Sequence, residues 1–415
     1  MLALLRRRNF GLLWLGGLVS YAGDWVLYAA LPYFVYARTG STIATAGMIA
    51  AELVPGVLLS SVAGVFVDRW NRKRILVVTN VLEAAAVALL LLVPDGGWIG
   101  FVFVATFLQA SFAAFETPAE GALLPTLVDE DELVPANALN ALNNRIGRVA
   151  GLPLGGFLLA FLGLRGVVIV DCATFVAAAL LIAPIVAPRR TPVRADEPAT
   201  GEAALSRWAA FWTEWVEGLR LVRRERTIAL LFVVLGIATF GGTMLDPLYA
   251  AWVRDVLGRG PEIYSWLLTA GALTGVAGTI LVGWFGSRLS PRVLMGWSSV
   301  VAGALNAVKF AIPSLVVAFG VALPIGVTSV ASSVAVETLA QRSVRDEYRG
   351  RVFGSLQATI WLLSLLGAMI GGALGEVFGI VTMLEVASGL VALSGLVVLR
   401  AYAGVDWRAE SAPAA

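Results

Sequence analysis

Hydrophobic residues along the chain gather into twelve long apolar segments separated by polar turns. They form two groups of six with a wider polar gap between them: 10–36, 42–67, 75–94, 98–124, 134–162 and 166–187, then 228–253, 262–286, 293–312, 315–340, 352–378 and 380–403. Each is long enough for the roughly 20 residues with which an α-helix crosses a bilayer. The pattern predicts an all-α membrane protein with twelve transmembrane helices in two pseudo-symmetric six-helix bundles.

The same grouping predicts the domain organisation. We expect an N-terminal bundle over 1–187, a cytoplasmic linker over 188–227, a C-terminal bundle over 228–404 and a cytoplasmic tail over 405–415. From Trp208 to Arg226 the linker alternates aromatic and basic positions, which is typical of an amphipathic helix in the membrane interface. A solvated helix packed on the base of the protein is an equally good interpretation.

Composition excludes several classes of protein. Of the 415 residues, 59% are hydrophobic and 14% charged, against about 25% charged in soluble domains. The chain has no histidine and one cysteine, so we expect no disulfide and no His/Cys metal site. A net charge of +2 gives no reason to expect a nucleic-acid partner. No Gly-x-x-x-x-Gly-Lys-Ser/Thr sequence occurs, so we expect no ATP site.

Basic residues outside the spans predict the topology. The N-terminal segment carries Arg6-Arg7-Arg8, and most other Lys and Arg fall in the loops on its side of the membrane. The opposite side receives Arg38, Arg165, Arg254, Arg259 and, marginally, Lys309. By the positive-inside rule, we expect both termini in the cytoplasm and a bacterial-type inner or plasma membrane location.

The two halves repeat each other. A shift of about 216 to 219 residues places Gly64 and Asp68-Arg69 on Gly283 and Ser287-Arg288, and Gly155-Gly156 on Gly371-Gly372. Duplicated six-span halves are typical of transporters that bind their substrate near the bilayer midplane and expose it alternately to each side.

One turn carries a recognisable motif. The second span ends in Gly64-Val-Phe-Val-Asp68-Arg69-Trp-Asn71-Arg72-Lys73-Arg74. This segment resembles the G-x-x-x-D-R-x-G-R-[RK] loop of the major facilitator superfamily, with Asn71 where the family usually has Gly. The weaker second copy, Gly283 to Arg288, has Ser287 in place of the acid. Gly64 is expected to be the small residue at which two helices cross. The resemblance implies the superfamily fold and a gate at this turn.

We expect Asp68 to latch that gate by facing the start of the eleventh span near Gly350 and Arg351. Arg72 and Glu120 would be its charge partners. Glu337 takes the place of Glu120 in the second half, so both are assigned to the cytoplasmic gate.

Further segments narrow the resemblance. They are Phe115-Glu-Thr-Pro118-Ala119 with Ala122 to Pro125, Asp171-x-x-Thr174-Phe175, Glu217 to Arg224 and Arg349-Gly350-Arg351-Val352. In this order they resemble the macrolide-efflux and enterobactin-exporter branch of drug:proton antiporters. In the fifth span, Gly151-Leu-Pro153-Leu-Gly155-Gly156 resembles the antiporter motif G-P-x-x-G-G. Gly147, Gly151 and Gly155 form a stripe of small residues at four-residue spacing, and plain helix packing explains this stripe equally well.

Ionisable residues inside spans are the sharpest functional signal, because a charge there costs about 2.5 to 3.5 kcal/mol on insertion scales. By the family's architecture, the residues able to face the pathway are Asp24, Glu52, Glu116, Arg145 and Arg148. Asp24 is a candidate for proton coupling or cation binding, with a structural hydrogen bond as the alternative, and Glu52 a weaker candidate. Glu116 and Glu120 are expected to form a salt-bridge group with the two arginines. Asp171, Lys309, Glu376 and Glu385 are assigned to spans 6, 9 and 12, which are peripheral in the family, and are interpreted as structural or interfacial.

The predicted function is export of an amphipathic small molecule in exchange for protons. Tyr21, Trp25 and Tyr28, with Phe112, Phe115 and Trp361 as expected neighbours, offer aromatic faces for such cargo. The family's R-x-x-Q-G pattern appears as Thr106-Phe-Leu-Gln109-Ala110 without its basic residue, so a mechanism based on that residue is not carried over. We expect a monomer in the lipid bilayer, driven by the proton gradient, with no cofactor and no enzymatic activity. The alternatives are an importer or lipid flippase and, more remotely, a non-transporting scaffold or enzyme.

Overall fold

The computed structural model describes residues 3–93, 97–186, 226–343 and 349–401. The predicted linker and its amphipathic segment up to residue 225, and the predicted tail, lie outside the described residues. Within the described ranges the regular structure is helical. The longer helices are α1 (Arg8–Thr39), α2 (Thr42–Arg69), α3 (Arg72–Ala88), α4 (Gly100–Ala113), α5 (Glu116–Leu123), α6 (Leu133–Ile182), α8 (Arg226–Met244), α9 (Asp246–Ala251), α10 (Pro261–Phe285), α11 (Pro291–Ala311), α12 (Leu315–Ser343), α13 (Arg349–Phe378) and α14 (Ile380–Ala401).

Eleven helical stretches among the described residues are long and apolar enough to cross a membrane. One of them contains α6, which carries two predicted spans in one assigned helix of 50 residues. Inside it Gly163 has φ 64° and ψ −171°, a backbone conformation that other residues adopt only with strain. Because Gly163 divides this one stretch into two spans, the eleven stretches correspond to the twelve predicted spans.

The chain divides into two compact units. Unit 1 is Met1–Thr39, Gly47–Phe211 and Arg259–Thr269; unit 2 is Gly40–Ala46, Trp212–Gly258 and Ala270–Ala415. The start of α10 therefore belongs to unit 1, where the Tyr33 hydroxyl donates to the carbonyl oxygen of Arg259 at 2.7 Å. The start of α2 belongs to unit 2, where the Thr42 hydroxyl donates to the carbonyl oxygen of Gly372 at 2.6 Å.

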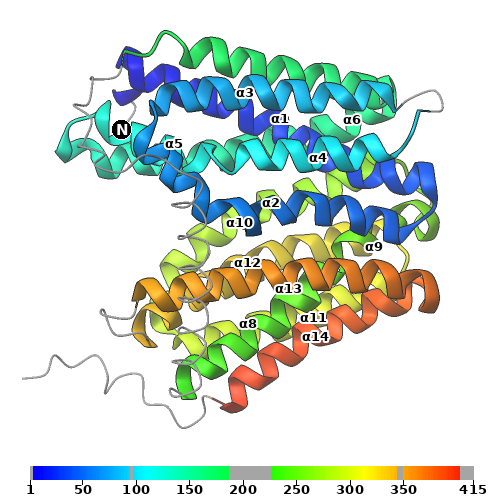
Figure 1. The fold of residues 1–415 in the computed structure, drawn as a ribbon. Coiled ribbons are helices and arrows are strands. Elements are labelled where there is room, and N and C mark those ends of the chain that lie inside the picture. Colours follow the sequence, from blue (N-terminus) through cyan, green and yellow to red (C-terminus); the bar gives the residue numbers. More distant parts are fainter. Residues whose placement is uncertain (1–2, 94–96, 187–225, 344–348, 402–415) are drawn as a thin grey trace, which may run out of the picture. The chain divides into compact units, whose positions relative to one another are not determined.

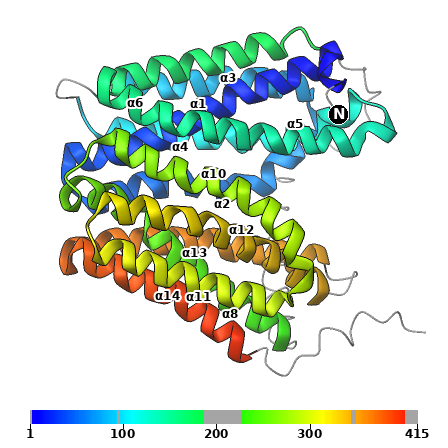
Figure 2. The same cartoon turned by 180° about the vertical axis from the view of Figure 1, so that it is seen from behind.

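Helix packing within each unit follows the internal repeat. In unit 1, α1 and α3 both pack against α6, and the three helices lie side by side (Figures 1 and 2). In unit 2, α8 packs against α13 and α14, and α11 packs against α14. Because α6 contains the counterparts of both α13 and α14, the two sets of contacts are equivalent. The duplication seen in the sequence is thus a duplication of packing.

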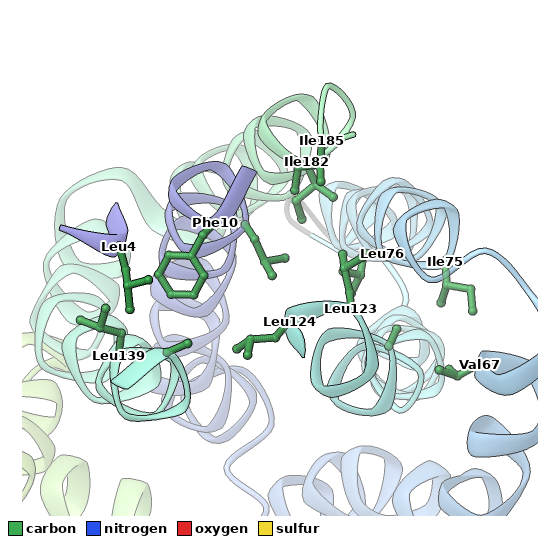
Figure 3. Packing of buried hydrophobic residues seen from close by; sticks show 13 residues of the cluster. Leu4, Phe10, Val67, Ile75, Leu76, Leu123, Leu124, Leu139, Ile182 and Ile185 are labelled. Atoms are coloured by element: carbon green, nitrogen blue, oxygen red, sulfur yellow. The ribbon is translucent and has the colours of Figure 1, made fainter. Parts of the chain in front are cut away.

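A cluster of buried apolar side chains closes one end of unit 1 (Figure 3). Leu4 and Phe10 pack there beside Leu139 of α6, and Leu76 of α3 lies near Ile182 at the far end of the same long helix. Arg7 ties the N-terminal segment to the residues before α6, with 2.9 Å to Asp129 and 2.7 Å to Glu132. The polar groups of unit 1 described next lie beyond this apolar cluster along α1 and α3.

Candidate functional site

Asp24 lies near the middle of α1 and is half-buried. The side-chain amide of Gln109 on α4 donates to its Oδ1 at 3.0 Å. Gln109 is the glutamine of the family's R-x-x-Q-G pattern, and in this chain it donates a hydrogen bond to the Asp24 carboxyl group. Glu52 on α2 is exposed, and its charge acts on Asp24. The structure thus brings the two coupling candidates into electrostatic reach within unit 1.

Aromatic side chains flank Asp24 along α1. Trp25 and Tyr28 meet edge to face, with ring centroids 5.0 Å apart. The guanidinium carbon of Arg148 lies 4.7 Å from the Trp25 ring centroid, a cation–π arrangement. Tyr28 is 39% exposed, so part of this aromatic surface is open.

The other predicted aromatic neighbours are more scattered. Phe115 meets Phe66 of α2, with centroids 6.1 Å apart. Phe112 is half-buried on α4, and Trp361 is half-buried on α13 in unit 2.

Glu116 and Glu120 take their hydrogen bonds from neutral groups. Oε1 of Glu116 accepts from the Asn80 amide at 2.6 Å and from the Thr79 hydroxyl at 3.3 Å. Oε2 of Glu120 accepts from the Tyr21 hydroxyl at 3.1 Å. The expected salt-bridge group with Arg145 and Arg148 is therefore not what holds these acids, because the helices present amide and hydroxyl donors to them instead. Both arginines are exposed on α6.

Two further acids join this cluster. Asp171 of α6, interpreted from the sequence as structural or interfacial on a peripheral span, has a fully buried side chain. A Cβ built on Gly23 would lie 2.4 Å from its Oδ1, which places the carboxyl group beside the α1 backbone next to Asp24. The other is Glu83 of α3, 1% exposed, which the sequence reasoning missed. Its signal was present, since it is an acid in the middle of a predicted span.

Three more sequence-based placements need correction. Glu376 lies on α13 rather than at the periphery, and accepts hydrogen bonds from the Ser41 hydroxyl and from the Ile43 amide at the start of α2. Lys309, expected near the outer surface, is 8% exposed, with its ammonium 4.7 Å from the Tyr249 ring centroid and 4.4 Å from that of Phe310. Gly64 was expected at a helix crossing, yet a Cβ there would meet no described atom within 4 Å.

The remaining gate residues are placed as follows. Arg72 donates to the carbonyl oxygen of Ala122 at 2.7 Å, and Lys73 to that of Ala183 at 3.1 Å. Four residues assigned to the loop motif, its second copy or the gate are exposed: Arg69, Gly283, Arg288 and Glu337. The side-chain surroundings of Asp68 and Arg351 and the environment of Gly350 lie outside the described residues, so the Asp68 latch stays a prediction.

The glycine stripe of α6 lies against α1. A Cβ on Gly147 would come within 2.9 Å of Tyr21, on Gly151 within 2.4 Å of the Ala22 carbonyl oxygen, and on Gly155 within 2.3 Å of that of Val26. Gly156 faces Ser265 at the start of α10 instead, and Pro153 lies inside the helix. The stripe lets the backbone of α1, which carries Asp24, approach α6 closely.

Among the described residues no group of three or more Asp, Glu or Cys side chains is arranged to hold a metal ion. What the site offers is a set of carboxyl groups in amide and hydroxyl contacts, next to an open aromatic surface. Such a set can bind and release protons and can provide a counter-charge for a cation.

Known proteins give the context for this arrangement. Macrolide efflux protein A of Streptococcus pyogenes is 25% identical over 385 residues, covering 90% of each chain. The multidrug efflux pump Tap of Mycobacterium bovis is 26% identical over 393 residues, covering 92% of this chain and 91% of its own. Among solved structures, a bacterial homologue of the iron transporter ferroportin in an inward-facing state has a TM-score of 0.75 at 18% identity, covering 95% of this chain and 98% of its own.

That structural likeness concerns the fold alone. The family model described as Major Facilitator Superfamily matches residues 13–251 and 231–414, which together span nearly the whole chain. The helices, the duplicated packing and the loop motif agree with this match. The chain therefore belongs to the Major Facilitator Superfamily, whose members are multi-pass membrane transporters.

Proposed function

We propose that this transporter exports an amphipathic small molecule in exchange for protons. The observation that carries the proposal is Asp24, a half-buried carboxyl group on α1 held by Gln109 and followed directly by the Trp25–Tyr28 pair. Two relatives of similar length are named as a macrolide efflux protein and a multidrug efflux pump, which supports export of a drug-like small molecule.

The chemistry of such a site is simple. Ionised Asp24 offers a counter-charge to a cationic cargo, and the aromatic faces of Trp25 and Tyr28 bind it without strict geometry. A proton on Asp24 removes that counter-charge, so proton and cargo compete for one group. If the proton arrives from one side of the membrane and the cargo from the other, alternating access couples their movements.

The proposed setting is a bacterial inner or plasma membrane with both termini in the cytoplasm. The proton gradient supplies the energy, and the working form is a monomer. The Asp68 motif serves as the cytoplasmic gate.

The test is accumulation of ethidium in inverted membrane vesicles with an imposed pH gradient. Wild type should accumulate the dye, and Asp24→Asn should lose gradient-driven accumulation because Asn imitates the protonated carboxyl group. Glu52→Gln, at equal protein level, is the matched control for removing an acid nearby. Full accumulation by Asp24→Asn would overturn the assignment, and loss in Glu52→Gln alone would move the role to α2.

The same vesicles separate export from its alternatives. Inverted vesicles expose the cytoplasmic side, so an exporter takes the dye up. Uptake confined to right-side-out vesicles would indicate an importer. Movement of a fluorescent phospholipid between leaflets without dye uptake would indicate a flippase.

A further inference from the structure

Glu83 is an acidic residue of α3 that is buried inside a membrane span. Its side chain is 1% exposed, and neither carboxylate oxygen has a hydrogen-bond donor among the described residues. An ionised carboxylate buried in this way is costly unless it is paired. Neither of the ion pairs seen among the described residues, those of Arg7 with Asp129 and Glu132, includes Glu83.

The group that meets Glu83 is another acid. Oε1 of Glu116 on α5 accepts from Asn80 and Thr79, which lie one turn before Glu83 on the same face of α3. The two carboxyl groups are therefore neighbours, and a hydrogen bond between them is within reach. That bond requires a proton, because two carboxylates have no donor between them. Like charges in contact also cannot both ionise without a large repulsion, which one shared proton removes.

The remaining surroundings of the pair are acidic or neutral. From α1 the charge of Asp24 acts on both glutamates, and from α6 that of Asp171 acts on Glu83. The Cys172 thiol of α6 donates to the carbonyl oxygen of Ala84, one residue from Glu83, at 3.3 Å. On the other side, Glu120 acts on Glu116 and is itself bonded to Tyr21. Among the described residues, the charges that act on the pair are negative, and one shared proton relieves their repulsion.

A small cavity borders Glu116, one member of the pair. It measures about 20 Å³, room for about one water molecule, and its polar lining comes from Ser20, Tyr21, Asn80, Glu116 and Glu120. Leu13, Leu76 and Ile182 of the apolar cluster also line this cavity. Oε1 of Glu120 is buried without a described hydrogen-bond partner. A single water between Glu120 and Glu116 would complete a row of exchangeable groups ending at Glu83.

We propose that Glu83 and Glu116 share one proton inside unit 1 and exchange it with the cytoplasmic side through Glu120 and this cavity. The proposal rests on the proton-coupled transport proposed above and identifies where the proton is held. Uptake adds one proton from water to the pair and changes its charge from −2 to −1; release returns the proton to water. No other bond forms or breaks. The loss of charge beside Asp24 makes that carboxyl group's own ionisation easier, which links the stored proton to the cargo site.

The direct test is infrared spectroscopy of the full-length protein in lipid nanodiscs during a pH titration, without cargo. Wild type should show a carbonyl band of a protonated carboxyl group that shifts in D₂O. Glu83→Gln and Glu116→Gln should each lose this band, because the Gln amide can donate to the remaining carboxylate in place of the proton. Glu385→Gln, an acid of α14 in unit 2, is the matched control and should keep it. A band that persists in both pair variants would overturn the proposal, as would a carboxylate response to Na⁺ in place of pH.

Transport gives the second readout. Glu83→Gln should lose ethidium accumulation driven by a pH gradient yet keep exchange of ethidium against ethidium, which needs no net proton movement. Retained exchange also shows that the variant is folded, and Glu116→Gln provides a second route should Glu83→Gln fail to fold. Gradient-driven accumulation at the wild-type level in both variants would overturn the shared proton while leaving the proposed export intact. Absence of gradient-driven transport in wild type would overturn the export and leave the infrared result to decide on the pair.

Discussion

At the residue scale, acids in this protein are kept in a membrane helix bundle by neutral donors. Asp24 accepts from Gln109, Glu116 from Asn80 and Thr79, and Glu120 from Tyr21. Amide and hydroxyl donors stabilise a carboxyl group without locking it into an ion pair, so its proton can still be exchanged. A salt bridge to Arg145 or Arg148 would have made the same acids structural.

Glycine at position 151 is a requirement of the close approach between α1 and α6. In Gly151→Ala the new Cβ would lie 2.4 Å from the Ala22 carbonyl oxygen, a backbone atom that moves only with α1. We expect a loss of about 1 to 3 kcal/mol of stability from this overpacking, measured as a lower thermal midpoint in detergent.

The matched control is Gly389→Ala on α14, where a Cβ would meet no described atom within 4 Å. That variant should be unchanged or more stable by up to about 1 kcal/mol, because alanine is the better helix former. Equal thermal midpoints for the two variants would contradict the close approach.

At the element scale, helices are interrupted where the sequence or the packing demands it. Gly163 separates the two spans in α6, and a turn at Ala114 and Phe115 divides the fourth span into α4 and α5. That turn places Glu116 in the first turn of α5, where its Oε1 accepts from Asn80 and Thr79 of α3.

Glu376 of α13 acts as an added cap for α2. Its carboxylate accepts from Ser41 and from the backbone amide of Ile43, one of the amides that a helix start leaves unpaired. Because the side chain is exposed, we expect Glu376→Ala to cost about 0.5 to 2 kcal/mol, the range of helix-capping residues.

Hydrogen exchange at the first turn of α2 measures this effect locally. Exchange should accelerate in Glu376→Ala and less in Glu376→Gln, which keeps an oxygen acceptor. Unchanged exchange in the alanine variant would show that α2 begins stably without the cap.

At the scale of the whole molecule, the chain is a duplicated fold whose halves differ in chemistry. Unit 1 holds the carboxyl cluster of Asp24, Glu83, Glu116 and Asp171. In unit 2, Lys309 lies buried among aromatic rings. The repeat preserves the packing of helices while the side chains of the two halves have diverged.

Topology can be tested directly because Cys172 is the one cysteine of the chain. In a Cys172→Ser background, a cysteine introduced at Arg6 should react with a membrane-impermeant maleimide in inverted vesicles and not in intact cells. A cysteine at Gly40 or Gly258, in turns on the opposite side, should react in intact cells. The same labelling pattern at all three positions would contradict the predicted orientation.

The sequence by itself determined the number and length of the spans, the duplication, the loop motif and the glycine stripe. It could do so because a chain in lipid must satisfy its backbone hydrogen bonds within each segment, so that hydropathy alone marks the helices. The sequence also predicts where helices pack closely, because four-residue spacing puts Gly147, Gly151 and Gly155 on one face of a helix.

Only the tertiary structure decided which polar residues meet. Glu83, Glu116 and Asp171 lie on three helices, and their meeting depends on how each helix is rotated about its axis and which neighbour it packs against. Hydropathy carries little of that information when a span is apolar on all sides, as α2 and α4 are in the sequence. Side-chain packing sets the rotation, and for this reason Glu83 was missed, Asp171 was placed at the periphery, and the partners of Glu116 and Glu120 were expected to be arginines.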